Sequence, residues 1–138
     1  MKYFDKDFML GNLSDEETEK RIKKYKEQIE CILKKSDYNM RLLISYISLH
    51  DAQIKKIETT DNALQIQISG GDNQSGYFSL IIYFDVKSKI DANNIVLPFN
   101  IVYYEYDFSK EYILSLISDD EREIEIKFNK VSIRIDNK

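Results

Sequence analysis

The sequence predicts an α+β protein in which two N-terminal helices pack on one face of a largely antiparallel, meander-like sheet of about six strands. Two observations lead to this fold class. Apolar residues recur at helical spacing through the first third of the chain, and they alternate with polar residues, as in strands, through the rest. The change of period falls at residues 49–54, a segment that holds His50, the only histidine of the chain.

The chain is predicted to form one domain over residues 1–138, with a helical part (1–50) and a sheet part (51–138). A length of 138 residues lies near the commonest domain size, and 43% hydrophobic content supplies one core without disulfides or metal. One proline, four glycines and no low-complexity tract leave no segment with the composition of a linker.

The first helix is expected over residues 15–35, a length of about 30 Å at 1.5 Å per residue. Ser14 begins a capping box, in which its hydroxyl accepts a hydrogen bond from the amide of Glu17. One face of this helix is apolar, at the spacing of an amphipathic helix: Ile22, Tyr25, Ile29, Ile32 and Leu33. Packing on the sheet is the expected role of this stripe, and a partner-helix role is the alternative. Cys31 lies half a turn away and is predicted to be exposed.

A second, shorter helix follows a cap at Ser36 or Asp37. Its inner face is predicted to consist of apolar residues at helical spacing: Met40, Leu43, Tyr46 and Ile47. Continuing the same phase places His50 on the inner face as well, where its ring should be mostly buried. Asp51 is then placed to receive a backbone amide or the His50 ring.

The strands follow the junction in order. Ile54 and Ile57 are out of step by one residue, which predicts a bulge in the first strand. Further strands are expected near residues 64–68, 78–84, 101–108, 112–117, 123–128 and 131–135. Pro98 marks a sheet edge or a break, and turns are expected at 70–76, 91–94, 119–120 and 129–130.

Charge limits the possible partners. The net charge is −4, and from residue 36 onward sixteen acidic residues face eleven basic ones. An acidic sheet region repels phosphate backbones, so nucleic-acid binding is not expected. A basic protein partner fits this charge better, although mild acidity also serves solubility alone.

Several other classes of function are not expected. The residues at the start of the sequence lack the apolar run of a secretory signal, and no apolar run approaches a membrane span. We therefore expect a cytoplasmic location. The single Cys31 offers no internal disulfide or zinc site. Residues 70–76 lack the ending of a phosphate-binding loop, and residues 119–123 lack calcium-loop spacing, so we expect no cofactor and no metal.

His50 with Asp51 is the first candidate site. The pair could form half of an acid–base or metal site, but catalysis needs a nucleophile or second base, and a metal needs further ligands. The alternative is a buried, hydrogen-bonded residue at the corner between helix and strand. No catalytic residue is assigned.

The second candidate site lies in the tyrosine-rich residues 103–108. On a strand, Tyr103, Glu105 and Asp107 face one way, and Tyr104, Tyr106 and Phe108 face the other. The second set is predicted to be core. The first set, an aromatic ring with two carboxylates, is a candidate recognition surface, and an ordinary half-solvated strand face is the alternative.

Three short motifs carry a family resemblance: MKYFxKDF at residues 1–8, LHDAxI at 49–54, and YEY at 104–106 leading to IxIxF at 124–128. They resemble a family of small bacterial cytosolic proteins known as a domain of unknown function, which implies no established activity. The small, acidic, helix-plus-sheet build is also similar in size and charge to immunity proteins of bacterial toxin systems.

The leading functional expectation is a non-catalytic, cytoplasmic protein-binding module, similar to an immunity protein. The alternative is a small-molecule-binding protein or enzyme with a pocket near His50. A flat acidic patch around Glu105 and Asp107 would favour the first, and a pocket with convergent polar groups would favour the second.

Overall fold

The computed structural model describes residues 1–60, 63–70, 79–85 and 95–136. In these ranges it has three helices and seven strands, so the predicted α+β class with an antiparallel sheet is confirmed. The helices are α1 (Lys6–Met9), α2 (Asp15–Lys35) and α3 (Tyr38–Tyr46). The strands are β1 (Ala52–Thr59), β2 (Ala63–Gly70), β3 (Ser79–Asp85), β4 (Phe99–Phe108), β5 (Tyr112–Ser118), β6 (Glu123–Phe128) and β7 (Lys130–Asp136).

Two counts in the prediction need correction. The sheet has seven strands instead of about six, and the expected segment near residues 131–135 is one of them: it forms β7, which pairs with β3. A short third helix, α1, precedes the two predicted ones, and the Asp5 carboxylate caps it by accepting from the Phe8 amide. The predicted turn at 91–94 and most of that at 70–76 lie outside the described residues.

The predicted helix caps are confirmed. The Ser14 hydroxyl accepts from the Glu17 amide at 3.1 Å, and the Asp37 carboxylate accepts from the Met40 amide at 2.9 Å. Each cap satisfies one of the amides that a helix leaves unpaired at its N-terminus. The predicted exposure of Cys31 on α2 is confirmed as well.

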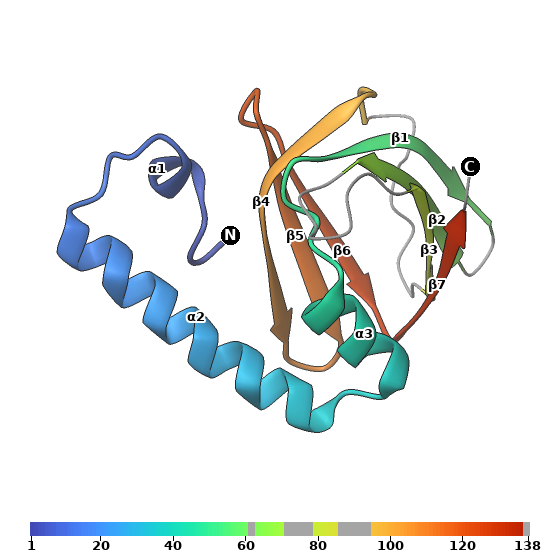
Figure 1. The fold of residues 1–138 in the computed structure, drawn as a ribbon, viewed down its shortest axis with the longest axis horizontal. Coiled ribbons are helices and arrows are strands. Elements are labelled where there is room, and N and C mark those ends of the chain that lie inside the picture. Colours follow the sequence, from blue (N-terminus) through green and yellow to red (C-terminus); the bar gives the residue numbers. More distant parts are fainter. Residues whose placement is uncertain (61–62, 71–78, 86–94, 137–138) are drawn as a thin grey trace.

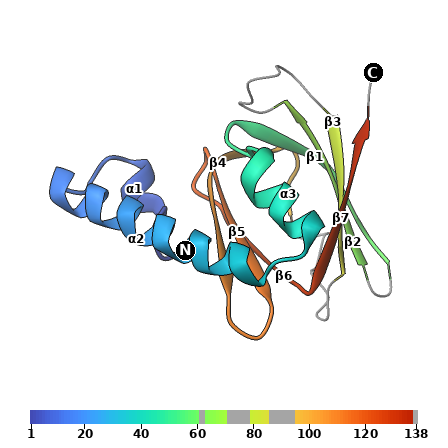
Figure 2. The same ribbon diagram turned by 60° about the horizontal axis from the view of Figure 1, so that its bottom comes forward.

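The sheet is strongly curved. Its strand order is β6-β5-β4-β1-β2-β3-β7, and every neighbouring pair is antiparallel. The edge strands β6 and β7 are nevertheless separated in the chain by Asn129 alone. The sheet therefore curls around α3 until its two edge strands meet at Asn129 (Figures 1 and 2).

Two irregularities interrupt the strand register. The predicted bulge of β1 is confirmed between Ile54 and Lys56, and a second shift lies between Ile101 and Tyr103 in β4. Pro98, predicted at an edge or break, directly precedes β4 and follows a cis peptide bond.

The core lies inside the curl. Helix α3 fills it with Met40 and Leu43, which are fully buried against the apolar faces of the strands. Helix α2 runs outside the curl, alongside β4 (Figure 2). The prediction that both helices pack on one face of the sheet is therefore wrong, because α3 fills the curl and α2 does not. Ile32 is the one buried residue of α2. No helix among the described residues is long and apolar enough to cross a membrane.

Two members of the predicted inner faces are exposed instead. Ile22 is 37% exposed, because the first half of α2 extends past the sheet (Figure 1). Tyr46 is 79% exposed. At 100° per residue it lies about 120° around α3 from Met40, outside the narrow stripe that the curl covers.

Candidate functional site: a cleft beside strand β4

The site begins at an incompletely paired edge of β4. On one side β4 pairs with β5 along most of its length, whereas on the other side it pairs with β1 at only two positions, Asn100 and Phe99. The remainder of that edge faces residues 50–51 at one end and α2 at the other. A strand edge carries backbone donors and acceptors that need partners, so what covers it determines what it can bind.

Helix α2 covers the far end of this edge through two side chains. The Tyr25 hydroxyl accepts a hydrogen bond from the Tyr106 amide at 2.8 Å, and the Gln28 amide group donates to the Tyr106 carbonyl at 2.7 Å. Burial raises the pKa of Tyr25 far above its ordinary value, so the hydroxyl keeps its proton at physiological pH.

His50 occupies the near end of the same edge. Its Nδ1 contacts the Val102 carbonyl, and since a carbonyl only accepts, Nδ1 carries the proton. Its Nε2 lies 3.6 Å from the Asp51 carboxylate, and the imidazole stacks on Tyr103 with ring centroids 5.5 Å apart. The Asp51 amide donates to the Ile101 carbonyl at 2.9 Å.

The predicted position of His50 on the inner face of the helix is wrong, and its side chain is only partly buried, at 38% exposure. Helix α3 ends at Tyr46, so the helical phase does not continue to residue 50. Leu49 takes the buried position instead, at 0% exposure. Asp51 then adopts a positive φ of 61°, which turns the chain into β1.

Between the two ends lies a cavity of about 750 Å³, which we call the β4 cleft. Helices α2 and α3, strand β4 and the N-terminal arm (residues 1–10) surround it. Six aromatic residues line it: Phe4, Phe8, Tyr25, Tyr103, Tyr104 and Tyr106. Its other lining residues are three isoleucines together with Lys26, Glu30 and His50.

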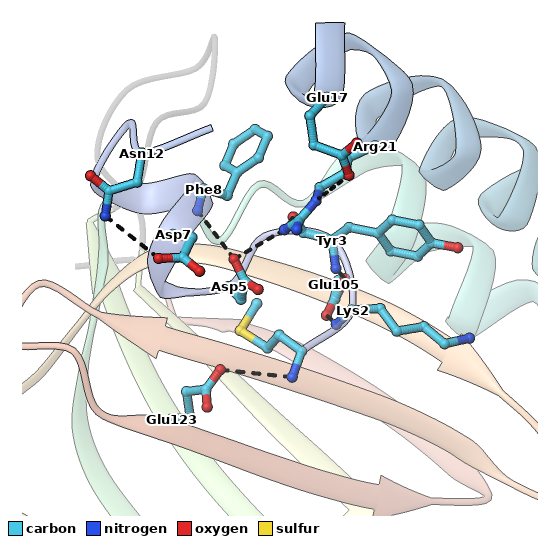
Figure 3. A network of polar contacts seen from close by, with 11 residues as sticks. Lys2, Tyr3, Asp5, Asp7, Phe8, Asn12, Glu17, Arg21, Glu105 and Glu123 are labelled. Atoms are coloured by element: carbon cyan, nitrogen blue, oxygen red, sulfur yellow. Dashed lines mark hydrogen bonds and ion pairs between the residues drawn. The ribbon is translucent and has the colours of Figure 1, made fainter. Parts of the chain in front are cut away.

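The predicted acidic recognition face is covered by the N-terminal arm. Glu105 is only 4% exposed, and its carboxylate accepts hydrogen bonds from the Lys2 amide at 2.5 Å and the Tyr3 amide at 3.0 Å (Figure 3). Burial raises the pKa of Glu105, and these two hydrogen bonds oppose that rise. The expectation of a half-solvated surface is therefore corrected for Glu105.

Asp107 and Tyr103, which share this strand face with Glu105, are partly covered as well. The Asp107 carboxylate lies 3.7 Å from the Lys2 ammonium. Tyr103 packs between the arm and His50, with ring centroids 5.3 Å from Phe8 and 6.0 Å from Phe4. The structure thus brings Tyr103, His50 and Asp51 together at the cleft, while Glu105 and Asp107 hold the arm.

Arg21 fastens the arm to α2. Its guanidinium donates to the Tyr3 carbonyl and to the Asp5 carboxylate, each at 3.1 Å, and to Glu17 at 3.2 Å (Figure 3). The pKa of Arg21 is raised by these carboxylates, which outweigh the opposing effect of burial. The same contacts fix Phe4, whose ring lies 4.8 Å from that of Tyr25 in the cleft wall.

Sequence reasoning missed the residues that build this cleft. Tyr25 is apparent from the sequence only as part of an apolar stripe, and Phe4 and Phe8 only as an apolar opening. No local signal places them at the edge of β4. Among the described residues no three His, Cys, Asp or Glu side chains form a group that could hold a metal ion.

Comparisons with protein-family models, curated proteins and solved structures found no match to this chain. The function must therefore be inferred from the geometry of the cleft.

Proposed function

We propose that this protein binds a neutral, largely aromatic small molecule in the β4 cleft. The observation that carries the proposal is the cavity of about 750 Å³ with six aromatic lining residues. Small-molecule sites are concave, mostly apolar and roughly 300–1,000 Å³ in volume, with a few polar groups that fix orientation. Aromatic walls favour an aromatic ligand, because rings gain from stacked and edge-on contacts.

The walls of the cleft are held in place before any ligand arrives. Phe4 packs edge-on against Tyr25, and Phe8 packs edge-on against Tyr103. Arg21 and Glu105 hold the arm that carries the two phenylalanines through hydrogen bonds to its backbone. A rigid wall lowers the ordering cost of binding, which supports a binding role.

Charges around the cleft support a neutral ligand. Lys26 and Glu30 are both exposed on α2 and bring one charge of each sign to the lining. The two ring nitrogens of His50 face the Val102 carbonyl and the Asp51 carboxylate. We therefore propose binding without catalysis, with His50 as a polar part of the wall.

The test is a titration with N-phenyl-1-naphthylamine, a neutral aromatic dye whose fluorescence rises in apolar surroundings. Ile22→Glu is the informative variant, because Ile22 lines the cleft yet is 37% exposed, so the substitution should leave folding intact. A charge beside an apolar ligand should weaken dye binding at least about tenfold, equivalent to about 1.4 kcal/mol.

Val96→Glu is the matched control. Val96 is 68% exposed and is not among the residues that line the cleft. It introduces the same charge elsewhere, so its affinity for the dye should equal that of the parent. Equal affinity of Ile22→Glu and the parent, or no binding by the parent, would refute the proposal.

A basic protein partner is the second candidate function. Tyr38 and Tyr46 are 78% and 79% exposed on α3, and exposed tyrosine is typical of protein interfaces. Glu123 and Glu125 are exposed on the edge strand β6 and suit a basic partner. Replacing both tyrosines by serine should abolish cross-linking to such a partner while leaving dye binding unchanged. Cross-linking that persists in the double variant would exclude the tyrosine surface.

A further inference from the structure

We infer that the ligand of the β4 cleft carries an amide-like N–H and C=O pair that hydrogen-bonds to the backbone of Tyr104. This inference rests on the proposed function and names the chemical class of the ligand, a planar aromatic lactam or amide. The protein groups that would recognise this amide belong to the backbone of β4 and not to any side chain.

Strand geometry directs the Tyr104 backbone groups into the cleft. In an antiparallel pair, the N–H and C=O of one residue point to the same side, and successive residues alternate between the two sides. Both groups of Tyr106 bond to α2, on the side away from β5. The two groups of Tyr104, two residues earlier, therefore also point away from β5, toward α2.

The positions on either side of Tyr104 are already occupied. The His50 ring contacts the Val102 carbonyl. Tyr25 accepts from the Tyr106 N–H, and Gln28 donates to the Tyr106 C=O. Strand β1 pairs with β4 only at Phe99 and Asn100 and does not extend to Tyr104. Within the described residues, the Tyr104 N–H and C=O have no protein partner, and Tyr104 lines the cleft.

The length of the free edge decides which amide fits. A peptide that adds a strand to a sheet uses backbone pairing at several alternate residues. Along this side of β4 from Val102 to Tyr106, only Tyr104 has both backbone groups without a partner among the described residues. From Val102 to Tyr106 the strand spans about 13 Å at roughly 3.3 Å per residue. A compact ligand with a single donor–acceptor pair fits this interval, and its aromatic part can lie against Tyr103 and Tyr104.

The test compares quinolin-2(1H)-one with its N-methyl derivative by titration into the full chain. The parent lactam presents an N–H and a C=O on one edge, and methylation removes the donor while keeping the aromatic surface. We expect the methylated compound to bind at least tenfold more weakly. We also expect the chemical shift of the Tyr104 amide proton to change more than that of any other backbone amide when the parent lactam binds.

A backbone variant tests the same contact from the protein side. Tyr104→Pro removes the N–H, and proline is tolerated on a strand edge whose N–H faces away from the ladder. Tyr104→Ala is the control, since it removes the ring but keeps the N–H. The proline variant should lose the preference for the unmethylated lactam, whereas the alanine variant should keep it. If the proline variant does not fold, the comparison of quinolin-2(1H)-one with its N-methyl derivative is sufficient by itself to test the amide contact.

The outcomes separate this inference from the proposed function. Equal affinity for the two quinolones, or no binding of either while N-phenyl-1-naphthylamine still binds, overturns the amide contact and leaves the cleft as a binding site. Failure of the dye and both quinolones to bind overturns both proposals.

Discussion

The hydroxyl of Tyr25 accepts a hydrogen bond from the backbone amide of Tyr106 at 2.8 Å. This contact joins the long outer helix to the incompletely paired side of β4 through a side chain, where a neighbouring strand would ordinarily supply a carbonyl. It fixes both the far end of the β4 cleft and the position of α2.

Removing that hydroxyl should destabilise the fold. Tyr25→Phe keeps the ring but leaves the Tyr106 amide without its acceptor, at a cost of about 1–3 kcal/mol. Urea unfolding measures the loss. Tyr46→Phe is the control, because Tyr46 is 79% exposed and its hydroxyl should contribute little. Equal stability of Tyr25→Phe and the parent would show that water replaces the hydroxyl without cost.

Glu105 should make stability depend on pH. Burial raises its pKa above the ordinary value of 4.5, so the folded state binds this proton more tightly than the unfolded state does. Between the pKa of Glu105 in the unfolded state and its higher pKa in the folded state, the folded state therefore carries more protons. The stability that protonated Glu105 contributes is lost as pH rises through that window. This contribution is fully present below the ordinary value.

Glu105→Gln isolates this effect. The free energy of unfolding, measured from about pH 4 to pH 7, should fall with pH more steeply in the parent than in the variant. The difference between the two proteins cancels the titration of the other carboxylates, including Asp120, whose pKa is lowered chiefly by its hydrogen bond to Arg122. Parallel profiles would contradict the raised pKa of Glu105.

Tyr106→Phe should stabilise the protein. Tyr106 is 1% exposed, and its hydroxyl is buried without a hydrogen-bond partner among the described residues. A buried, unpaired polar group costs about 1–3 kcal/mol, and phenylalanine removes it without changing the ring packing. We expect a gain of about 1 kcal/mol in chemical unfolding. A loss of stability would mean that the hydroxyl is paired in solution.

His50→Ala should cost about 1 kcal/mol, the scale of one hydrogen bond. The substitution removes the contact with the Val102 carbonyl and the stacking on Tyr103, but a side chain 38% exposed leaves no closed cavity. Thermal unfolding measures the change, with Asp51→Asn as a control that keeps the ring. A loss above about 3 kcal/mol would place His50 in the core after all.

The local features of this fold could be predicted from the sequence because each depends on a few adjacent residues. Ser14 and Asp37 cap their helices because the acceptor and the amide lie within three positions of each other. The bulge after Ile54 follows from the phase of the apolar residues in one strand.

The burial of particular side chains could not be predicted in the same way. Glu105 is covered by Lys2, which lies 103 positions away in the chain, and nothing near Glu105 indicates that cover. The predicted position of His50 is wrong because it continues the helical phase past Tyr46, where α3 ends. The cleft combines both problems, since it depends on where α2 lies beside an edge that β1 leaves unpaired.

The passage of the chain through Asn129 has a consequence for how the protein folds. The sheet consists of a leaf of three strands, β6-β5-β4, and a leaf of four strands, β1-β2-β3-β7. Two residue pairs between β1 and β4 join the leaves on one side. On the other side the join is Asn129, whose amide donates to the Asp85 carbonyl at 3.0 Å.

Neither leaf can bury its inner face alone, because that face packs against α3 and the opposite leaf. A newly made chain therefore keeps both apolar faces open until β7 reaches β3, the last pairing that its sequence order allows. Up to that moment the unfinished sheet is a surface on which other chains can assemble. Truncation before residue 130 should consequently yield aggregates instead of a smaller folded protein.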